Sequence, residues 1–447
     1  MRRWLIKEEL MMLPGQYDFT IGNLGTRKIR SSVSVSYYTP DDKRMLFNTY
    51  LKHFEDFRSK DGTPLCLEVA GPREFIFFEP SKTKAAIVTC GGLCPGINDV
   101  IRAIVMELYH RYRVANIIGI RYGFRGLVPQ CGHPVVELSP EGVKDIHTLG
   151  GSILSSSRGN QDPEEMVDAL KRMNVDILFC IGGDGTMRCA EILTAEVARR
   201  GLSISIIGIP KTIDNDLHLI QKTFGFDTAI SESVRVLQCA HAEAKGAYNG
   251  IGLVKIMGRQ SGHIACGAAL AQNDVNFVLI PEVPFDLDGP NGLLQSIRKR
   301  LGERGHSVIL VAEGAGQDLM RKKDQSVEKD PSGNVRLLDI GVFLKGAIEA
   351  YFKSVGMDVN LKYIDPSYMI RSVPANASDS IYCGALGQYA VHAGMAGKTG
   401  MLVAMMKDEY VHVPLTVVGS GMKVDPHGNV WTRVLESTGQ PASLTNL

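Results

Sequence analysis

From residue 84 onward, short apolar segments rich in β-branched residues alternate with longer amphipathic segments. The longer segments, such as 162–173 and 292–305, have their apolar residues at helical spacing. We expect strands at 85–90, 116–120, 176–182, 203–210, 250–257, 276–282 and 307–314. Strands that are apolar at nearly every position are typical of parallel sheets covered by helices on both faces. The pattern therefore predicts a doubly wound α/β architecture, in which ligands bind beyond the carboxyl ends of the strands.

Residues 1 to about 83 lack this alternation, and we interpret them as an N-terminal extension or small domain. Within them, 33–39 alternates like an edge strand, and 51–62 has the pattern of a helix end followed by a turn. A second irregular stretch, 317–335, is charged and contains glycine and proline. Its composition predicts a mobile surface loop.

The charge balance and the cysteines restrict the partners and the compartment of the chain. Its 447 residues carry 49 Lys and Arg against 48 Asp and Glu, a formal net charge of +1. Such a chain has no overall attraction for nucleic acid or an anionic membrane, so a local cluster must hold any anionic ligand. Nine scattered cysteines without zinc-site spacing indicate a reducing compartment, and no apolar run approaches the ~18 residues of a membrane span. We therefore expect a cytoplasmic protein without nucleic-acid or membrane partners.

Glycine-rich loops follow two of the predicted strands. The first loop, GGLCPGIN at 91–98, opens a helix, whose N-terminus can offer free N–H groups to a phosphate. A tight turn without a ligand explains this loop equally well. The loop is neither a GxGxxG pattern nor a P-loop, so neither of those phosphate-binding mechanisms can be claimed for it. The second loop is GGDGT at 182–186, where Asp184 lies among three glycines. Because Mg²⁺ is usually held by one or two carboxylates plus phosphate oxygens, this second loop favours phosphoryl chemistry.

The next predicted strand is followed by PKTIDND at 210–216, which contains Asp214 and Asp216. Two carboxylates at this spacing can face one site if the backbone between them is not extended. Beside a metal-bound phosphate, one acid can take a proton from a hydroxyl nucleophile while the other assists with the metal or the geometry. The alternative, a helix cap with a solvated neighbour, is weaker because this loop is expected beside GGDGT.

Together the motifs resemble those of the phosphofructokinase family. GGLCPGIN, GGDGT, PKTIDND, MGRQSG at 257–262, the pair Pro281-Glu282 and a later YxxR follow the family's order and approximate spacing over residues 84–420. The chain is more similar to the longer branch with an N-terminal extension than to the compact bacterial type. The resemblance implies a Mg²⁺-assisted, ATP-dependent glycolytic enzyme that converts fructose 6-phosphate into fructose 1,6-bisphosphate. It also implies a homotetramer or homodimer; a pyrophosphate-dependent enzyme and a non-catalytic regulatory subunit remain as alternatives.

The resemblance assigns roles to individual residues. Asp214 would be the base for the sugar 1-hydroxyl, and Asp184, with Asp216, would serve Mg²⁺. Thr212 would contact the transferred phosphoryl group, and Arg158 would steady the terminal phosphate of the nucleotide. The implied ATP-binding residues are Gly92, Arg158, Gly183, Asp184, Gly185 and Thr186. The implied substrate-binding residues are Thr212, Asp214, Met257, Gly258, Arg259, Glu282, Lys362, Tyr368 and Arg371, with the last three on the 6-phosphate.

Two residues bear on the phosphoryl donor. Pyrophosphate users in the family typically carry a second Asp after the metal-binding Asp, whereas this chain has Gly185, which leaves room and adds no charge. Lys211 points the other way, because compact ATP users usually have Gly there and pyrophosphate users have Lys. Steric room is the harder constraint, so we predict ATP, with pyrophosphate as the alternative.

The family's fold implies two three-layer α/β/α domains with the active site between them. The larger, on the ATP and Mg²⁺ side, would comprise 84–225 and 368–425; the smaller, on the sugar side, would comprise 226–367 and 426–447. Compact members donate an arginine from a neighbouring subunit at the position of Gly250, which Tyr248 could replace here. Of two effector-site arginines, Arg102 has a match but the second falls on Met106, so control by the usual bacterial effectors is not expected.

Overall fold

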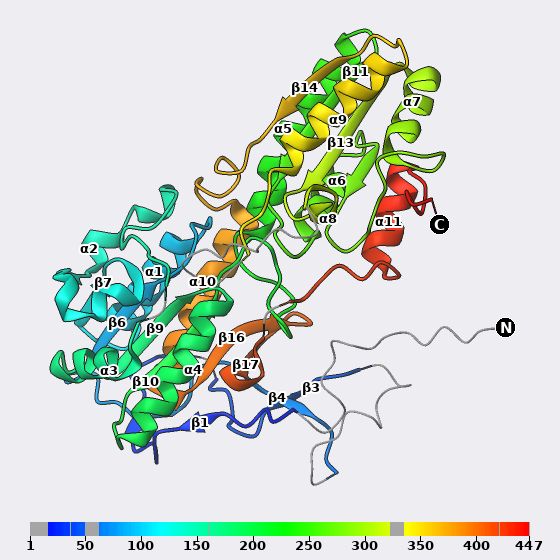
Figure 1. Ribbon diagram of the computed structural model, residues 1–447. Coiled ribbons are helices and arrows are strands. Elements are labelled where there is room, and N and C mark those ends of the chain that lie inside the picture. The colour runs from blue at the N-terminus through cyan, green and yellow to red at the C-terminus, as the bar shows by residue number, and fades with distance from the viewer. Residues whose placement is uncertain are drawn as a thin grey trace.

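The computed structural model describes residues 17–35, 37–49, 62–159, 161–321, 335–419 and 421–446. Two main sheets are stacked along the molecule, as Figure 1 shows, with the smaller one at the top. Strands of the larger sheet are, in spatial order, β3 (Arg44–Leu46), β4 (Cys66–Val69), β17 (Glu409–Pro414), β16 (Met401–Met406), β10 (Ser205–Pro210), β9 (Ile177–Gly182), β6 (Lys84–Thr89), β7 (Asn116–Ile120) and β8 (Val136–Glu137). Those of the smaller sheet are β12 (Phe277–Leu279), β13 (His306–Ala312), β11 (Gly250–Ile256) and β14 (Asn360–Ile364).

The strands that matter for the site run parallel. In the larger sheet β16, β10, β9, β6 and β7 pair in parallel, and all pairs of the smaller sheet are parallel. The described helices are α1 (Ile97–Met106), α2 (Pro140–Val143), α3 (Pro163–Arg172), α4 (Asp184–Arg199), α5 (Phe226–Gly246), α6 (His263–Ala271), α7 (Leu293–Arg304), α8 (Gln317–Met320), α9 (Ile340–Ser354), α10 (Ala377–Met395) and α11 (Asn429–Thr438). None of them combines the length and apolar character that a membrane crossing requires.

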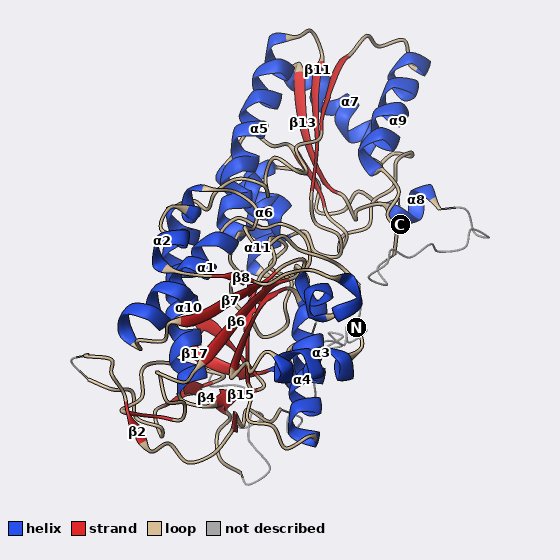
Figure 2. Cartoon of the chain, turned by 90° about the vertical axis from the view of Figure 1, so that its left-hand side faces the viewer, coloured by secondary structure: helices blue, strands red, loops and turns tan. Residues whose placement is uncertain are grey.

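Each main sheet is covered on both faces, because successive strand residues point to opposite sides. In β9, Phe179 joins the core beneath α1 and α10, whereas Cys180 joins the core beneath α3 and α4. Figure 2 shows these helix pairs on opposite sides of the strands, and α5 lies across the smaller sheet from α7 and α9. The doubly wound architecture predicted from the apolar strands is thereby confirmed.

The N-terminal residues extend the larger sheet rather than standing apart from it. Besides β3 and β4, β1 (Gly22–Asn23) pairs with β15 (Lys398–Thr399), and β2 (Ile29–Arg30) with β5 (Phe75–Ile76). The attachment includes a buried ionic cluster in which Glu68 accepts from Arg73 at 3.1 Å, and from Lys398 and His412 at 2.9 Å. Burial alone would raise the pKa of Glu68, but the hydrogen bonds from His412 and Lys398 hold it well below its usual range.

The sequence predictions for irregular segments have mixed outcomes. The strand expected at 33–39 is wrong: the described residues there have no strand pairing, and the nearest strand is β2. The alternation at 33–39 does not correspond to one buried face, since Val33 is buried while Val35 and Tyr37 are exposed. The stretch 51–61 lies outside the described residues, as does 322–334 of the predicted mobile loop, whose first residues form α8. The residue boundaries predicted for the two domains stay a prediction.

Candidate active site

The three motif loops of the larger sheet meet at one edge. β10, β9 and β6 are neighbours, so their carboxyl ends bring together the loops at 210–216, 182–186 and 90–96. The four parallel strands of the smaller sheet likewise end in adjacent loops, at 257–262, 280–282, 313–314 and 365–371. The side chains of both sets interact electrostatically around Asp214, which defines the candidate site.

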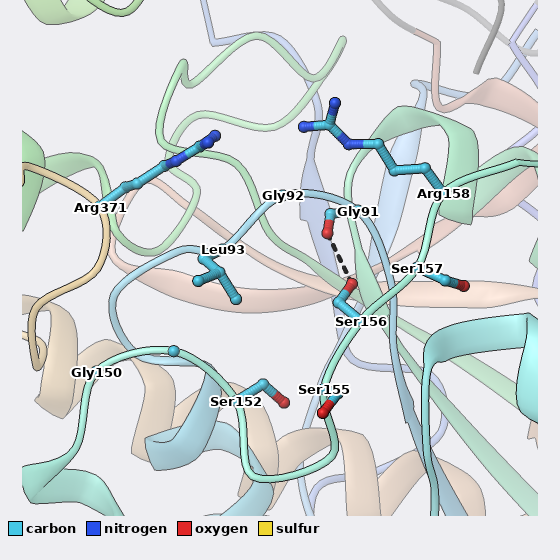
Figure 3. A pocket seen from close by; sticks show the side chains of 11 residues that line it. Gly91, Gly92, Leu93, Gly150, Ser152, Ser155, Ser156, Ser157, Arg158 and Arg371 are labelled. Atoms are coloured by element: carbon cyan, nitrogen blue, oxygen red, sulfur yellow. Dashed lines mark hydrogen bonds between the residues drawn. The ribbon is translucent and has the colours of Figure 1, made fainter. Parts of the chain in front are cut away.

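The glycine-rich loop after β6 borders an open cavity of about 670 Å³ (Figure 3). Gly91 has a φ of 88°, a left-handed conformation that favours glycine. The loop is fixed to a neighbouring segment, because Gly91 N donates to the Ser157 carbonyl at 3.1 Å and Ser156 Oγ donates to the Gly91 carbonyl at 2.7 Å. Glycines and serines line most of this cavity, which therefore offers many small polar groups to a ligand.

Two arginines from distant parts of the chain converge on the cavity. Figure 3 shows Arg158 and Arg371 reaching toward each other from opposite sides of Gly92. A β-carbon at Gly92 would lie 3.2 Å from Arg371 Nη1 and 3.3 Å from Arg158 Nη2, so both guanidinium groups lie close against this glycine. Burial, and then the charge of Arg158, lower the pKa of Arg371. Two like charges held together in this way provide a site for an anion.

Lys211 lies behind the glycine-rich loop rather than in the cavity. Its side chain is 5% exposed, and Nζ donates to the Gly92 carbonyl at 2.7 Å. Burial lowers the pKa of its ammonium group. The lysine that the sequence associates with the phosphoryl donor thus contacts the backbone of the loop that borders the cavity.

The loop after β10 turns its two acids toward the same region. Asn215 between them has a φ of 50°, and its side-chain oxygen accepts from Thr223 N at 2.8 Å, which fixes the turn. Thr212 Oγ1 donates to Asp216 Oδ1 and accepts from Asp214 N, both at 3.1 Å. The left-handed residue supplies the non-extended backbone on which the sequence hypothesis depended.

Asp214 differs from its neighbour in having an unused acceptor. Its Oδ1 is buried and, among the described residues, has no hydrogen-bond partner. Burial, followed by the charges of Asp216 and Glu313, raises the pKa of Asp214 to about 7. Buried polar atoms in native proteins are normally paired, so this oxygen is well suited to meet a ligand. An acid with such a pKa can accept a proton near neutral pH.

Asp184 begins α4 immediately after β9. Its carboxylate pairs with Arg188, with 2.6 Å between Arg188 Nη2 and Oδ2. Burial raises the pKa of Asp216, and the nearby charge of Asp184 raises it further, so the two acids lie close together. Within the described ranges no group of three or more His, Cys, Asp or Glu forms a ready metal cage. Two carboxylates nevertheless fit Mg²⁺, which takes its remaining ligands from phosphate and water.

Gly185, Gly183 and Thr186 form the start of the same helix. A β-carbon at Gly185 would meet no described atom within 4 Å, whereas one at Gly183 would lie 3.2 Å from the Lys211 carbonyl. The space beside Gly185 is therefore open. Gly183 caps α4, whose first N–H groups and helix dipole favour an anion.

Glu313 belongs to the candidate site although our sequence analysis did not identify it. It follows β13 directly, so the apolar run 308–312 is followed by an acid. Burial raises the pKa of Glu313, while the charges of Arg259, Lys255 and Arg371 oppose the rise, so its carboxylate faces cations. The signal that could have found it is this acid at a strand end, whereas Glu282 was assigned through its motif in the family resemblance.

Glu282, which the sequence predicts as a sugar contact, has backbone partners instead. One oxygen, Oε1, accepts from Gly262 N at 2.9 Å and from Val424 N at 2.8 Å. The other, Oε2, accepts from Gly262 N at 3.1 Å. The carboxylate thus accepts hydrogen bonds from the backbone of the protein itself. The predicted sugar contact stays a prediction.

The remaining predicted sugar-side residues are distributed over two loops. Arg259, beside Met257 and Gly258 after β11, donates from Nη1 to the Val335 carbonyl at 3.2 Å. Arg371 lies over the ring of Tyr368, with 5.1 Å from its guanidinium carbon to the ring centre.

Other predicted positions lie further from this cluster. Lys362 is exposed on the edge strand β14, and among the described residues no hydrogen bond or ring contact joins it to Tyr368 or Arg371. Tyr248, beside Gly250, is 79% exposed.

Comparison with known proteins identifies the family. Residues 84–394 match the Phosphofructokinase family. The chain belongs to the phosphofructokinase family. A relative from Borreliella burgdorferi named ATP-dependent 6-phosphofructokinase is 49% identical, covering 96% of this chain and 98% of the relative. Another of that name, from Amycolatopsis methanolica, is 50% identical, covering 84% of this chain and 83% of the relative. The family predicted from the motifs is thereby confirmed.

Solved structures of the family share the fold. The phosphofructokinase of Pichia pastoris in the T-state aligns with a TM-score of 0.61 at 21% identity, over 76% of this chain and 35% of that longer chain. A pyrophosphate-dependent phosphofructokinase from Marinobacter aquaeolei aligns with a TM-score of 0.64 at 18% identity, over 80% of this chain and 91% of the other. At these identities the likeness concerns the fold alone.

Proposed function

We propose that this protein is an ATP-dependent 6-phosphofructokinase, which transfers the terminal phosphoryl group of ATP to the 1-hydroxyl of fructose 6-phosphate in glycolysis. The observation that carries the proposal is Asp214, whose buried Oδ1 lacks a partner among the described residues and whose pKa is raised to about 7. This acid lies where the arginine-lined cavity of the larger sheet meets the cations of the smaller sheet. Two relatives near half identity that carry this name support the same activity.

Asp214 acts as the general base. The sugar O1 forms a bond to the terminal phosphorus, the bond from that phosphorus to the bridging oxygen of ADP breaks, and the hydroxyl proton passes to Asp214. Its raised pKa makes the carboxylate basic enough to accept this proton near neutral pH. Thr212 contacts the transferred group, and its bond to Asp216 keeps the hydroxyl in place.

Cationic groups hold the phosphates on either side of the transfer. Arg158, opposite Gly92, steadies the terminal phosphate of the nucleotide, where charge on the phosphoryl oxygens needs an electrophilic partner. Arg371 and Tyr368 bind the 6-phosphate of the sugar, assisted by Lys362. The backbone of Gly183, Gly185 and Thr186 receives the nucleotide at the start of α4.

Asp184 and Asp216 are the residues that would hold Mg²⁺. Their oxygen donors and their proximity, which raises the pKa of Asp216, fit a hard divalent cation shared with the nucleotide. When bound, the cation neutralises charge on the phosphate oxygens. Asp184 would give up its ion pair with Arg188 to hold the cation.

The sugar hydroxyls face the loops of the smaller sheet. Met257, Gly258 and Arg259 contact the sugar from the loop after β11. Glu313, half-buried and acted on by cations that include Arg259, is the carboxylate best placed to accept hydrogen bonds from sugar hydroxyls. Glu282 can contribute only with the acceptor capacity that Gly262 and Val424 leave unused.

ATP is the donor. The open space beside Gly185 supports this choice because it leaves room for the nucleotide beyond its terminal phosphates. Lys211 is occupied by the Gly92 carbonyl, which weakens the argument for pyrophosphate. The intact acids Asp184, Asp214 and Asp216 argue against a regulatory subunit that has lost catalysis.

The proposal also covers compartment and assembly. All nine cysteines are free thiols, which supports a reducing compartment such as the cytoplasm. The family resemblance supports a homotetramer or homodimer. Sedimentation of the purified protein at several concentrations tests the assembly, and a monomer at all of them would contradict it.

The test is formation of fructose 1,6-bisphosphate from fructose 6-phosphate and Mg²⁺, with ATP and pyrophosphate in parallel reactions. We expect product with ATP and little with pyrophosphate. Asp214→Asn, purified identically, controls for a contaminating host enzyme. Product with pyrophosphate but not with ATP would mean that the donor is pyrophosphate. No product with either donor would contradict the proposed activity and favour the non-catalytic subunit.

A further inference from the structure

The segment that returns the chain to the smaller sheet passes the catalytic loop. It leaves β17, crosses between the sheets and reaches α11, as Figure 1 shows in orange and red. On the way, Gly421 N and Met422 N both donate to the Asp216 carbonyl at 3.1 Å. His218 N, two residues beyond Asp216, donates to the Gly419 carbonyl at 2.8 Å. The crossing segment, here residues 419 and 421–424, is therefore attached to the loop that carries Asp214 and Asp216.

The far end of this crossing segment is attached to Glu282. Val424 N donates to Glu282 Oε1 at 2.8 Å, and the same carboxylate accepts from Gly262 N at 2.9 and 3.1 Å. Gly262 caps α6 and ends the 257–262 loop, where a carboxylate is favoured by the helix dipole. One side chain thus connects the crossing segment to the loop predicted to contact the sugar.

The close approach at Gly262 shows that this contact is built into the packing. A β-carbon there would lie 2.4 Å from Ile280 Cγ2 and 3.0 Å from Glu282 Oε2. Only glycine lets its N–H reach the carboxylate. The carboxylate accepts from one backbone N–H group in each of two segments, and the charge of Lys423 in the crossing segment also acts on it, so Glu282 holds the two segments together.

We propose that Glu282 is a positioning residue that couples the sugar-side loop at Gly262 to the catalytic loop at Asp216, through Val424 and Met422. The inference deepens the proposed function and rests on it for its kinetic part. Glu282 touches neither reacting group. It acts by fixing the sugar-side loop relative to Asp214, and misplacement by about 1 Å in such an arrangement can lower turnover by about a hundredfold.

Glu282→Gln tests the coupling because the amide keeps the size of the side chain but turns one acceptor into a donor facing Gly262 N or Val424 N. Glu107→Gln is the matched control: as at Glu282, burial raises the pKa of this glutamate, but Glu107 lies after α1, away from the site. Each variant is compared with the parent by hydrogen–deuterium exchange of peptides covering 212–217, 257–262 and 421–425, by thermal melting and by steady-state kinetics.

We expect Glu282→Gln to accelerate exchange in all three peptides and to lower kcat by about tenfold or more. Glu282→Asp, which keeps the charge on a shorter side chain, should give an intermediate result and replaces the Gln variant if that one does not fold. Glu107→Gln should leave the three peptides and kcat unchanged.

Three results would overturn the coupling. A rise in KM for fructose 6-phosphate alone, with unchanged kcat and exchange, would make Glu282 a sugar ligand. A lower melting temperature with unchanged kcat and unchanged exchange at 212–217 would make it a structural residue, and no change at all would remove any role. If the parent protein itself lacks activity, the proposed function fails, while the exchange at 212–217 still decides whether Glu282 couples the loops.

Discussion

Glu282 and Glu313 lie at the ends of two neighbouring strands of the smaller sheet, yet the fold treats them differently. Glu282 is bound to backbone N–H groups of Gly262 and Val424, with three contacts between 2.8 and 3.1 Å. Glu313 faces Arg259, Lys255 and Arg371, all cations, and interacts with Asp214. Burial raises the pKa of both carboxyls.

The different surroundings of Glu282 and Glu313 show that burial alone does not identify a ligand-binding acid. What separates the two is whether the protein itself supplies the hydrogen bonds that a buried carboxylate needs. Backbone N–H groups supply the hydrogen bonds of Glu282, which therefore stabilises the arrangement of the two segments that donate them. Glu313 and Asp214 lie near charged side chains. Asp214 Oδ1 in addition has no hydrogen-bond partner among the described residues. A substrate can supply the hydrogen-bond partners that such acids lack.

The largest effect should come from the acid with the unused oxygen. Asp214→Asn removes the base, and we expect kcat to fall by about 10² to 10⁴, since general-base catalysis supplies roughly that factor. Substrate binding should change little because the side chain keeps its size. Steady-state kinetics with both substrates measures the effect. Turnover within a few-fold of the parent would show that Asp214 is not the general base. It would also contradict the distinction between Asp214, which has an oxygen without a hydrogen-bond partner, and Glu282, whose oxygens both have one.

A second test places a new acid where the protein offers no partner. Gly185→Asp would put a carboxylate into the open space beside the predicted nucleotide phosphates. Like charges about 4 Å apart repel by about 4 kcal/mol at an effective dielectric of 20, so kcat/KM for ATP should fall by at least about a hundredfold. Gly246→Asp, on an exposed helix end with equally open space, is the control. Equal losses with ATP and pyrophosphate would refute the steric and electrostatic argument.

Much of this arrangement was predictable from the sequence. The seven predicted strands are found within a few residues, because continuous apolar runs have few alternatives to the interior of a parallel sheet. Strand order then follows from the fold, and it brings the 91–98, 182–186 and 210–216 loops together. The strand predicted at 276–282 shortens to 277–279, since its last residues leave the sheet to place Glu282 against Gly262.

Other features could not be read from local pattern. The attachment of the N-terminal residues depends on Glu68 meeting Lys398 and His412, which are more than 300 positions away. The role of Glu282 depends likewise on Val424, a contact that no spacing within either segment indicates. Sequence identified a glutamate at a strand end, but only the long-range contacts separate Glu282 from Glu313.

A smaller effect should distinguish the two glutamates directly. Glu313→Gln keeps the shape but removes the charge that faces Arg259, so we expect KM for fructose 6-phosphate to rise about tenfold, the effect of losing one charge-assisted hydrogen bond. KM for ATP should stay unchanged. Glu282→Gln should instead act mainly on kcat. If the two variants show the same pattern in kcat and KM, the comparison between a substrate-facing and a backbone-bound glutamate is wrong.

The smallest effect concerns the pH dependence of the same variant. Asp214 must be ionised to accept a proton, and its pKa is about 7, so kcat/KM for fructose 6-phosphate should fall as the pH drops through that value. Burial and the charges of Asp216 and Glu313 raise this pKa, while Arg259 and Arg371 lower it. Removing the charge in Glu313→Gln therefore lowers the pKa of Asp214 and moves the acid limb to lower pH.

Profiles of kcat/KM from pH 5.5 to 8.5 for the parent, Glu313→Gln and Glu282→Gln measure this shift, each normalised to its own plateau (a range set by about 1.5 units on either side of the pKa). Glu282 is not among the charges that act most on Asp214, so its variant should keep the parent's acid limb. A limb that moves upward in Glu313→Gln, or equally in both variants, would contradict the placement of Glu313 beside the base. The direction matters more than the size, because a carboxylate that interacts with Asp214 through charge can move its pKa only this way when neutralised.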